Sequence, residues 1–384
     1  SVDIPLFDST IRDIDIDMKK DYINLNAKGV ILTNDITTYA KIVNKTTPPF
    51  IVEDFDVKTD VLDLNVIANT FNDYDTNKLK NRETSSNTMT VSPEQVIIKN
   101  GTISADKIRI KKAEATDFNA KVTMGDDHIL HIDKYAFNLA NGSVDGDIAT
   151  NLSTFESNAT MNIKDADAEL ISENIFDMPG QMYGIVTGDL RVSCKGTNSV
   201  DCLDTLSGDG SFKVKNGRMP KLGSLEYLLK AANLVTGGIT GVSVNGIIDL
   251  ITPLKTGDFS QISGDIKLEN GAANDINVYS EGKELNMYMT GRYNLETLVA
   301  DMEVYGSLSK NFSTLLGRIG NASLNRLLNR IPGININEIN PESTSNINKI
   351  PNFNKENAVR VFKSEIFGDI NGTNYVKSFK WITH

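Results

Sequence analysis

The chain has 384 residues, enough for two or three domains or for one long β-rich unit. Its net charge of -11 argues against a nucleic-acid partner, because affinity for phosphate backbones comes mainly from clustered Lys and Arg. The sequence has no run of about 18 apolar residues, so it predicts no membrane-spanning helix.

The first residues, SVDIPLFDSTIRDIDIDMKK, have neither the basic start nor the apolar centre of an export signal. The chain also begins at Ser1 and not at Met. We therefore expect a portion of a longer protein, with an export signal or membrane anchor outside this sequence.

The dominant period along the chain is two. In DFNAKVTM the apolar residues alternate with polar ones, which is typical of a strand with one dry and one wet face. Many other segments repeat this pattern, and no segment alternates strands with helices as a parallel α/β fold does. The apolar positions that we expect to share one face are Phe118, Ala120, Val122, Met124, Tyr135, Phe137, Leu139, Ile266, Leu268, Ile276, Val278, Leu285, Met287 and Met289.

Asn-Gly pairs punctuate the alternating runs, as in GDGSFKVKNGRM and SGDIKLENGAAN. Both residues tolerate the positive φ of a tight hairpin turn, so each pair predicts a turn. Their irregular spacing favours a long antiparallel meander over a solenoid of fixed period. The predicted turns are Asn100-Gly101, Asn141-Gly142, Asn216-Gly217, Asn245-Gly246, Asn270-Gly271 and Asn371-Gly372.

Helical period occurs clearly in two places, near 221–236 and near 309–331. The second helix carries Arg318, Arg326 and Arg330 and no acidic residue. Two interpretations stay open. The helix caps one end of the sheet with its Arg side chains in solvent, or it contacts anionic lipid head groups through those arginines.

Cys194 and Cys202 flank a turn-rich interval of seven residues, which could close as a disulfide in an oxidising compartment. The alternative is two unpaired thiols in a reducing one. His128 and His131 would point to opposite faces of a strand, so we expect no metal site. The sequence has no nucleophile or phosphate-loop motif, and we expect neither an enzyme nor a cofactor.

The one-sided strands need a cover for their apolar face, because leaving it in water would forfeit about 25 cal/mol per Å². A second sheet could pack on it as a β-sandwich, or the sheet could close on itself. Alternatively, the sheet could curl into an apolar groove that holds lipid acyl chains, for which aliphatic and Met-rich walls are suited.

The succession LSGDGSFKVKNGRMPKLGSLEYLLKAAN and then DFSQISGDIKLENGAANDINVYSEGKELNMYMTGRYNLETL resembles the C-terminal region of AsmA-like proteins of bacteria. The resemblance covers about 110 residues and depends on the order of strand, turn and helix motifs. The positions that match are Gly208, Gly210, Phe212, Val214, Asn216, Gly217, Phe259, Ile262, Gly264, Ile266, Leu268, Asn270, Gly271, Gly291, Tyr293, Asn294 and Leu295.

The resemblance implies a mainly β protein, an elongated antiparallel β-sheet curled into an apolar groove, with two amphipathic helices in the C-terminal half. It further implies a periplasmic protein tethered to the inner membrane, which binds phospholipid or another acyl lipid and supports lipid transport and outer-membrane biogenesis. Envelope proteins are possible partners, and nucleic acid is not.

We expect four regions along the chain: an N-terminal β region (1–94) that continues a longer groove, the AsmA-like groove (95–334), a flexible linker (335–357) and a terminal β-hairpin (358–384). The tail beyond Asn335 departs from the family. The alternative function is a structural or protein-binding β-sandwich of the cell envelope. A carbohydrate-binding protein is disfavoured, because the chain has a single tryptophan, Trp381.

Overall fold

The computed structural model describes residues 2–4, 9–31, 34–66, 95–177, 179–180, 182–196, 199–219, 258–282, 285–297, 299–308, 346–353, 361–369 and 376–382. The chain forms two compact units. Unit 1 comprises Ser1–Ala166, Asn174–Phe176 and Asp189–Leu206. Unit 2 comprises Asp167–Glu173, Asp177–Gly188 and Ser207–His384.

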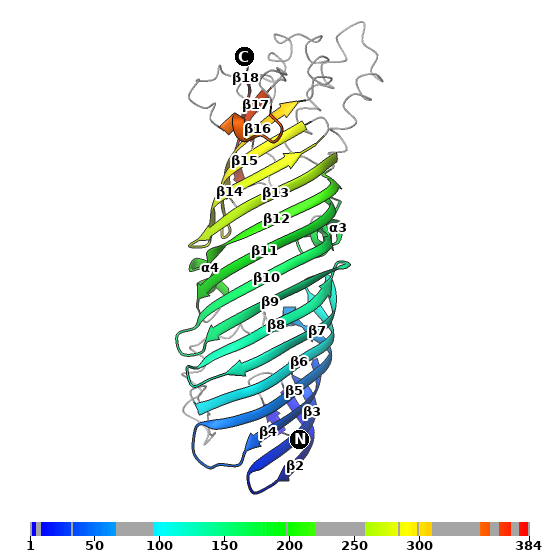
Figure 1. Cartoon of the computed structure of the whole chain (residues 1–384), viewed down its shortest axis with the longest axis vertical. Helices are drawn as coiled ribbons and strands as arrows, with labels where there is room; N and C mark the ends of the chain where they lie inside the picture. Colours follow the sequence, from blue (N-terminus) through cyan, green and yellow to red (C-terminus); the bar gives the residue numbers. More distant parts are fainter. Residues whose placement is uncertain are drawn as a thin grey trace. The chain divides into compact units, whose positions relative to one another are not determined.

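Unit 1 is built from strands that pair with their neighbours in chain order (Figure 1). The pairing is antiparallel except between β5 and β6, which are parallel. These two strands lie on either side of the predicted boundary between residues 94 and 95, so that boundary does not separate the compact units. The strands are β1 (Val2–Ile4), β2 (Ser9–Met18), β3 (Tyr22–Ile31), β4 (Asn34–Val43), β5 (Phe50–Asp63), β6 (Val96–Ile110), β7 (Ala113–Met124), β8 (Ile129–Leu139), β9 (Gly142–Asn151) and β10 (Glu156–Asp167).

Unit 2 contains an antiparallel sheet in which consecutive strands from β12 to β18 pair in chain order. Its strands are β12 (Ser207–Arg218), β13 (Asp258–Glu269), β14 (Ala272–Glu281), β15 (Leu285–Asn294), β16 (Val299–Leu308), β17 (Val361–Asp369) and β18 (Val376–Ile382). The remaining elements of the described chain are β11 (Tyr183–Lys195), α3 (Ala168–Asn174) and α4 (Ser199–Asp204).

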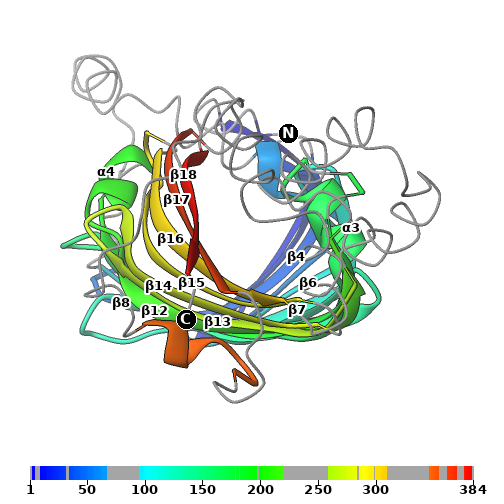
Figure 2. The same cartoon turned by 90° about the horizontal axis from the view of Figure 1, so that it is seen from above.

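The prediction of a mainly β protein with a curved antiparallel sheet is confirmed (Figures 1 and 2). In each unit the described strands form one layer and not two stacked sheets, so they do not form the β-sandwich that was the alternative. The two predicted amphipathic helices, near 221–236 and 309–331, lie outside the described residues. Among the described residues, no helix combines the length and the hydrophobicity needed to cross a membrane.

Two of the predicted Asn-Gly turns are confirmed. The turn between β8 and β9 is formed by Ala140 and Asn141, with φ values of 49° and 63°, and Gly142 begins β9. Asn270-Gly271 joins β13 to β14 with φ values of 50° and 71°. Both residues of the pair take the expected positive φ only at Asn270-Gly271, whereas at the first turn Ala140 and not Gly142 has positive φ beside Asn141.

Two other predicted turns are wrong. Asn100-Gly101 lies inside β6, and Asn216-Gly217 lies inside β12. Asn216 does have a positive φ of 50°, but β12 continues through it and stays paired with β13. The pairs Asn245-Gly246 and Asn371-Gly372 fall outside the described residues.

Within the region predicted as a flexible linker (335–357), residues 346–353 contain a short 3₁₀ turn that packs on unit 2. Ile347 and Ile350 are each only 2% exposed, because they pack against tyrosines of the sheet. We call residues 346–353 the outer segment. After it, β17 and β18 pair antiparallel within the region predicted as a terminal hairpin.

Local irregularities keep the apolar residues of unit 1 on one face. In β7 the register shifts near Asp117, which has a φ of 59°. Ala115 and Phe118 therefore share a face, although residues three apart in a regular strand point to opposite faces. Lys134 has a φ of 51° and lies at a similar shift in β8. Such bulges reverse the side-chain alternation once, which a strict period of two cannot describe.

Candidate functional site

One face of the unit 1 sheet carries apolar and small side chains on every strand from β3 to β10. Directly opposed residues on neighbouring strands share a face, so the registers define it. Val122, for example, lies opposite Gly101 on β6 and Ile132 on β8. The apolar face of unit 1 includes Leu25, Ala27, Ile36, Ala40, Val52, Phe55, Val57, Ile98, Gly101, Ile103, Ala105, Ile108, Ala115, Phe118, Ala120, Val122, Met124, Leu130, Ile132, Tyr135, Phe137, Leu139, Val144, Gly146, Ile148, Ala159, Met161 and Ile163.

Unit 2 has an equivalent face. Phe212 on β12 lies opposite Gly264, which lies opposite Val278 on β14, and the series continues through Met289 and Val304. The apolar face of unit 2 includes Phe212, Val214, Ile262, Gly264, Ile266, Leu268, Ala273, Ile276, Val278, Leu285, Met287, Met289, Gly291, Tyr293, Ala300, Met302, Val304, Gly306, Phe362 and Ile366.

The position of the outer segment shows which way the unit 2 sheet curves. It packs on Tyr288 and Tyr305, which alternate with the apolar residues of β15 and β16 and so lie on the opposite face. Figure 2 shows the outer segment, in orange, outside the curve of the strands. The apolar face of unit 2 therefore lies on the concave side, and the face with the tyrosines on the convex side.

The convex face of unit 2 is held together by a row of tyrosines. The rings of Tyr279 and Tyr288 stack with centroids 5.1 Å apart, and Tyr288 and Tyr305 follow at 6.3 Å. The hydroxyl of Tyr288 donates to Asn277 Oδ1 at 2.6 Å, and Lys349 of the outer segment approaches the same hydroxyl at 3.2 Å. The outer segment thus covers the row by hydrophobic contact and one charged hydrogen bond.

A buried charge completes this cluster. Lys363 is 9% exposed and pairs with Glu303, which also accepts a hydrogen bond from the Tyr305 hydroxyl at 2.7 Å. Burial works to lower the pKa of Lys363, but its contacts with Glu303 and Tyr305 raise that pKa above the usual value. For the Tyr305 hydroxyl, by contrast, burial raises the pKa, because it disfavours the charged phenolate. These groups are paired with one another, which suits a structural role.

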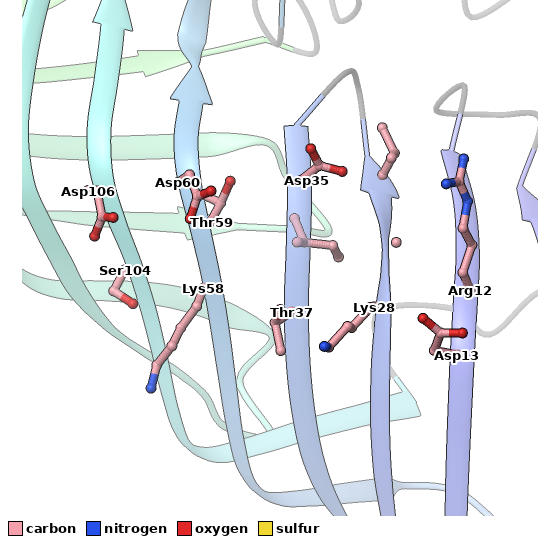
Figure 3. Close-up of a pocket in the computed structure, with 13 residues that line it drawn as sticks. Arg12, Asp13, Lys28, Asp35, Thr37, Lys58, Thr59, Asp60, Ser104 and Asp106 are labelled. Atoms are coloured by element: carbon pink, nitrogen blue, oxygen red, sulfur yellow. The ribbon is translucent and has the colours of Figure 1, made fainter.

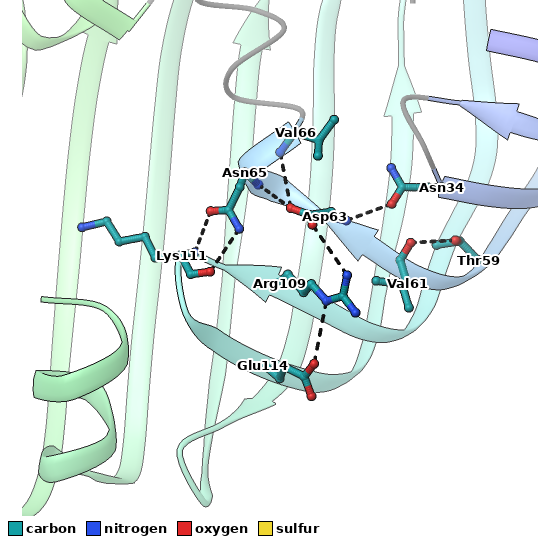
Figure 4. Close-up of polar contacts among 9 residues, drawn as sticks. All are labelled: Asn34, Thr59, Val61, Asp63, Asn65, Val66, Arg109, Lys111 and Glu114. Atoms are coloured by element: carbon teal, nitrogen blue, oxygen red, sulfur yellow. Dashed lines mark hydrogen bonds and ion pairs between the residues drawn. The ribbon is translucent and has the colours of Figure 1, made fainter. Parts of the chain in front are cut away.

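Polar contacts fix one end of β5 and the β6–β7 turn in unit 1 (Figure 4). The carboxylate of Asp63 accepts hydrogen bonds from the backbone N–H groups of Asn65 and Val66, at 3.0 and 3.3 Å. The Asn65 side chain accepts from the N–H of Lys111 at 2.7 Å and donates to its carbonyl at 3.1 Å. These bonds hold Leu64 against the apolar cluster of unit 1.

A cavity of about 430 Å³ lies in unit 1, but it is polar (Figure 3). Its charged lining comes from positions of β2 to β6 that alternate with the apolar face, so it opens on the other side of the sheet. The charged side chains that line it are Arg12, Asp13, Lys28, Asp35, Lys58, Asp60 and Asp106. This mixture of exposed cations and carboxylates offers no surface for an acyl chain.

All fourteen residues predicted to share an apolar face do so within their units. In unit 1 these are Phe118, Ala120, Val122, Met124, Tyr135, Phe137 and Leu139, and none of them is exposed. In unit 2 they are Ile266, Leu268, Ile276, Val278, Leu285, Met287 and Met289, again with none exposed. That they contact lipid stays a prediction.

The other predicted site residues have different outcomes. Arg318, Arg326 and Arg330 lie outside the described residues. Cys194 and Cys202 form a disulfide, with Cα atoms 5.0 Å apart, between the end of β11 and α4. His131 lies on β8, whereas His128 lies in the turn before it, and no group of side chains suited to a metal occurs among the described residues.

Sequence reasoning did not predict that glycines in phase with the apolar positions lie opposite aromatic side chains. Gly101 was assigned to a turn, yet it lies on the apolar face directly opposite Phe55. Gly146 and Gly306 occupy similar places, opposite Tyr135 and Phe362. A glycine at an apolar position of an alternating run is the signal that could have identified them.

Searches of protein-family models, curated proteins and solved structures found no match to this chain.

Proposed function

We propose that the chain binds the acyl chains of phospholipids or other lipids along its apolar faces. The observation that carries this proposal is the absence of any Asp, Glu, Lys or Arg at the described paired positions of these faces, in either unit. The charged residues of the same strands alternate onto the opposite face, as Lys121 does beside Val122.

The chemistry of these faces favours the hydrocarbon part of a lipid over its head group. Aliphatic, aromatic and thioether side chains contribute about 25 cal/mol for each Å² of apolar surface removed from water, without regard to direction. A charged head group needs charged partners, and the described paired positions of these faces offer only a few neutral polar groups, such as the hydroxyls of Thr59 and Ser280. Acyl chains would lie along the sheet while head groups stay in solvent.

The resemblance to AsmA-like proteins gives this binding a cellular context. We propose a non-enzymatic, periplasmic role in lipid transport between the inner and outer membranes and in outer-membrane biogenesis, with an inner-membrane anchor in the full-length protein. Continuous apolar strands would provide a path of low polarity along which a lipid could move without covalent chemistry.

Charged substitutions on the two faces test the proposal. Val122→Asp in unit 1 and Met287→Lys in unit 2 should each reduce co-purifying lipid at least about tenfold, because an unpaired charge in an apolar site costs several kcal/mol. Lipid is measured by mass spectrometry of organic extracts. Lys121→Glu and Lys267→Glu are matched controls, since both lysines are exposed on the opposite face and should leave the lipid content unchanged.

Circular dichroism and gel filtration should first show that each variant keeps a folded β structure. Equal lipid content in the folded charged variants and their controls would refute acyl-chain binding on these faces. A wild-type protein that carries no lipid would favour a structural or protein-binding role in the cell envelope.

A further inference from the structure

Besides Phe259, which lies opposite Gly217 beyond the irregularity of β12 at Asn216, four aromatic residues on the apolar faces lie directly opposite a glycine on the neighbouring strand. Two pairs belong to unit 1 and two to unit 2, and each is a cross-strand pair in register. The pairs are Phe55 with Gly101, Tyr135 with Gly146, Phe212 with Gly264 and Phe362 with Gly306.

In each pair the ring occupies the space above the glycine. A methyl group added to Gly101 would overlap the Phe55 ring, and its three nearest neighbours would all be atoms of that ring. The same is true of Gly306 and the ring of Phe362. At Gly264 the added carbon would lie 2.7 Å from Cε1 of Phe212, far inside van der Waals contact.

A hydrogen bond shows how flat one of these rings lies. Tyr135 is on β8, and its hydroxyl donates to the carbonyl of Thr160 on β10 at 2.8 Å. The intervening strand is β9, so the ring has to cross Gly146 to reach its acceptor. Burial, more than the nearby carboxylates Asp145 and Asp147, raises the pKa of this hydroxyl.

A side chain at the opposed position would prevent this arrangement. Opposed residues have Cβ atoms only about 5 Å apart, and their side chains normally stand away from the sheet. With glycine opposite, the ring can instead lie against the backbone at about 3.5–4 Å. Glycine weakens a strand interior, so its use here indicates that the close approach of the ring matters.

We infer that these four glycines determine which lipids the apolar faces accept. By letting the rings lie flat, the glycines leave more space above each apolar face, and a two-chain phospholipid needs that space more than a single acyl chain does. This inference rests on the function proposed above. If a ring stood upright, a two-chain lipid would be excluded before a single chain, because it needs the larger cross-section.

Gly101 and Gly306 give the cleanest test, since an added side chain there meets the ring first. Gly101→Val and Gly306→Val should each lower binding of a fluorescent phosphatidylglycerol at least about fivefold, in line with size discrimination in apolar sites. Binding of a fatty acid with the same fluorophore should change much less. Titration of the full chain after removal of bound lipid measures both probes.

Removing the ring distinguishes an effect of Gly101→Val on the space above the sheet from an effect on folding. Phe55→Ala alone should keep phosphatidylglycerol binding, and Gly101→Val combined with Phe55→Ala should restore it, because no ring remains to be raised. If glycine were needed only for folding of the sheet, the double variant would bind no better than Gly101→Val. That result, or unchanged binding in a folded Gly101→Val protein, would overturn the inference.

A measurement without lipid distinguishes failure of this inference from failure of the proposed function. Trp381 is the only tryptophan, so Phe55→Trp in a Trp381→Phe background reports on the ring at position 55. Acrylamide quenching of this tryptophan should rise when Gly101→Val is added. Unchanged quenching in a protein that binds phosphatidylglycerol would refute the inference alone, whereas failure of the wild type to bind either probe would refute the proposed function and the lipid selectivity with it.

Discussion

The two units have similar apolar faces but secure the rest of their sheets differently. On the convex face of unit 2, Tyr288 and Tyr305 are buried under the outer segment, with exposures of 0% and 1%. The polar face of unit 1 instead carries exposed charges around a polar cavity, and a disulfide ties the chain between Cys194 and Cys202.

The contacts that stabilise the sheet differ between the two units, whereas the apolar face is common to both. Tyrosine packing, a disulfide and polar turns are alternative ways to stabilise a single-layer sheet that has no second sheet for a core. The apolar face, with its opposed aromatic and glycine pairs, recurs in both units. It is therefore the feature that a function shared by both units can use.

The largest expected difference between the units concerns their tyrosines. Tyr288→Ala should lower the free energy of unfolding by about 3–5 kcal/mol, because it removes a fully buried ring and leaves a cavity under the outer segment. Tyr39, on the polar face of unit 1, is half-buried and makes only a 3.5 Å hydrogen bond to Asn24. Tyr39→Ala should cost about 1 kcal/mol or less.

Chemical denaturation followed by circular dichroism measures both variants. Limited proteolysis adds a local measurement, since Tyr288→Ala should release the outer segment and expose it to cleavage near Ile350. Equal destabilisation by the two substitutions would show that the convex face of unit 2 is not specially stabilised.

The disulfide should have an intermediate effect, confined to unit 1. Cys194 and Cys202 are 8 residues apart in sequence, and closing so short a loop stabilises by about 2–3 kcal/mol on the chain-entropy account. Cys194→Ser with Cys202→Ser should lower the stability of unit 1 by about that amount. Hydrogen exchange should speed up around the hydrogen bond between Thr205 and Lys195, while the amides near Tyr288 stay protected.

The smallest effect should come from one carboxylate on the polar face of unit 1. Thr102 donates to Asp56 at 2.6 Å, and this bond, more than the ion pair with Lys58, holds the pKa of Asp56 below its usual value. A lowered folded-state pKa stabilises the protein above the unfolded pKa of about 3.9, and this contribution is lost as pH falls through the folded value.

Thr102→Val should therefore lower stability by less than about 1 kcal/mol at pH 7, since Asp56 is partly exposed. The difference from wild type should shrink as the pH falls below about 4. Thermal unfolding across this pH range measures it. A difference that stays constant with pH would mean that the threonine acts through packing and not through the charge of Asp56.

The sequence predicted the composition of the candidate site better than its geometry. Phe118 to Met124 alternate so regularly that one strand face had to be apolar, and the register confirms it. Asn-Gly pairs were less reliable, because the sequence cannot tell a glycine needed for positive φ from one needed for space. Gly271 has a φ of 71° in a turn, whereas Gly101 makes room for Phe55 within a strand.

The outer segment is a second feature that the local sequence pattern could not predict. Residues 346–353 read as polar and punctuated by Pro351, which predicts a linker, yet Ile347 and Ile350 are buried. Their partners, Tyr288 and Tyr305, are far away in sequence and occupy the phase of their strands opposite to the apolar face, so the local pattern gives no indication that they form a binding surface. Only the pairing of β15 with β16 brings the two rings together.

The sequence by itself determined that the strands have one apolar and one polar face, because side-chain alternation is a property of each strand alone. It also determined the hairpin turns at Asn141 and Asn270, where local backbone geometry is decisive. Only the tertiary structure decided that the apolar face of unit 2 is the concave one, that aromatic rings lie flat over opposed glycines, and that residues 346–353 cover a tyrosine row. Each of these depends on contacts between residues far apart in the chain, which a local pattern does not encode.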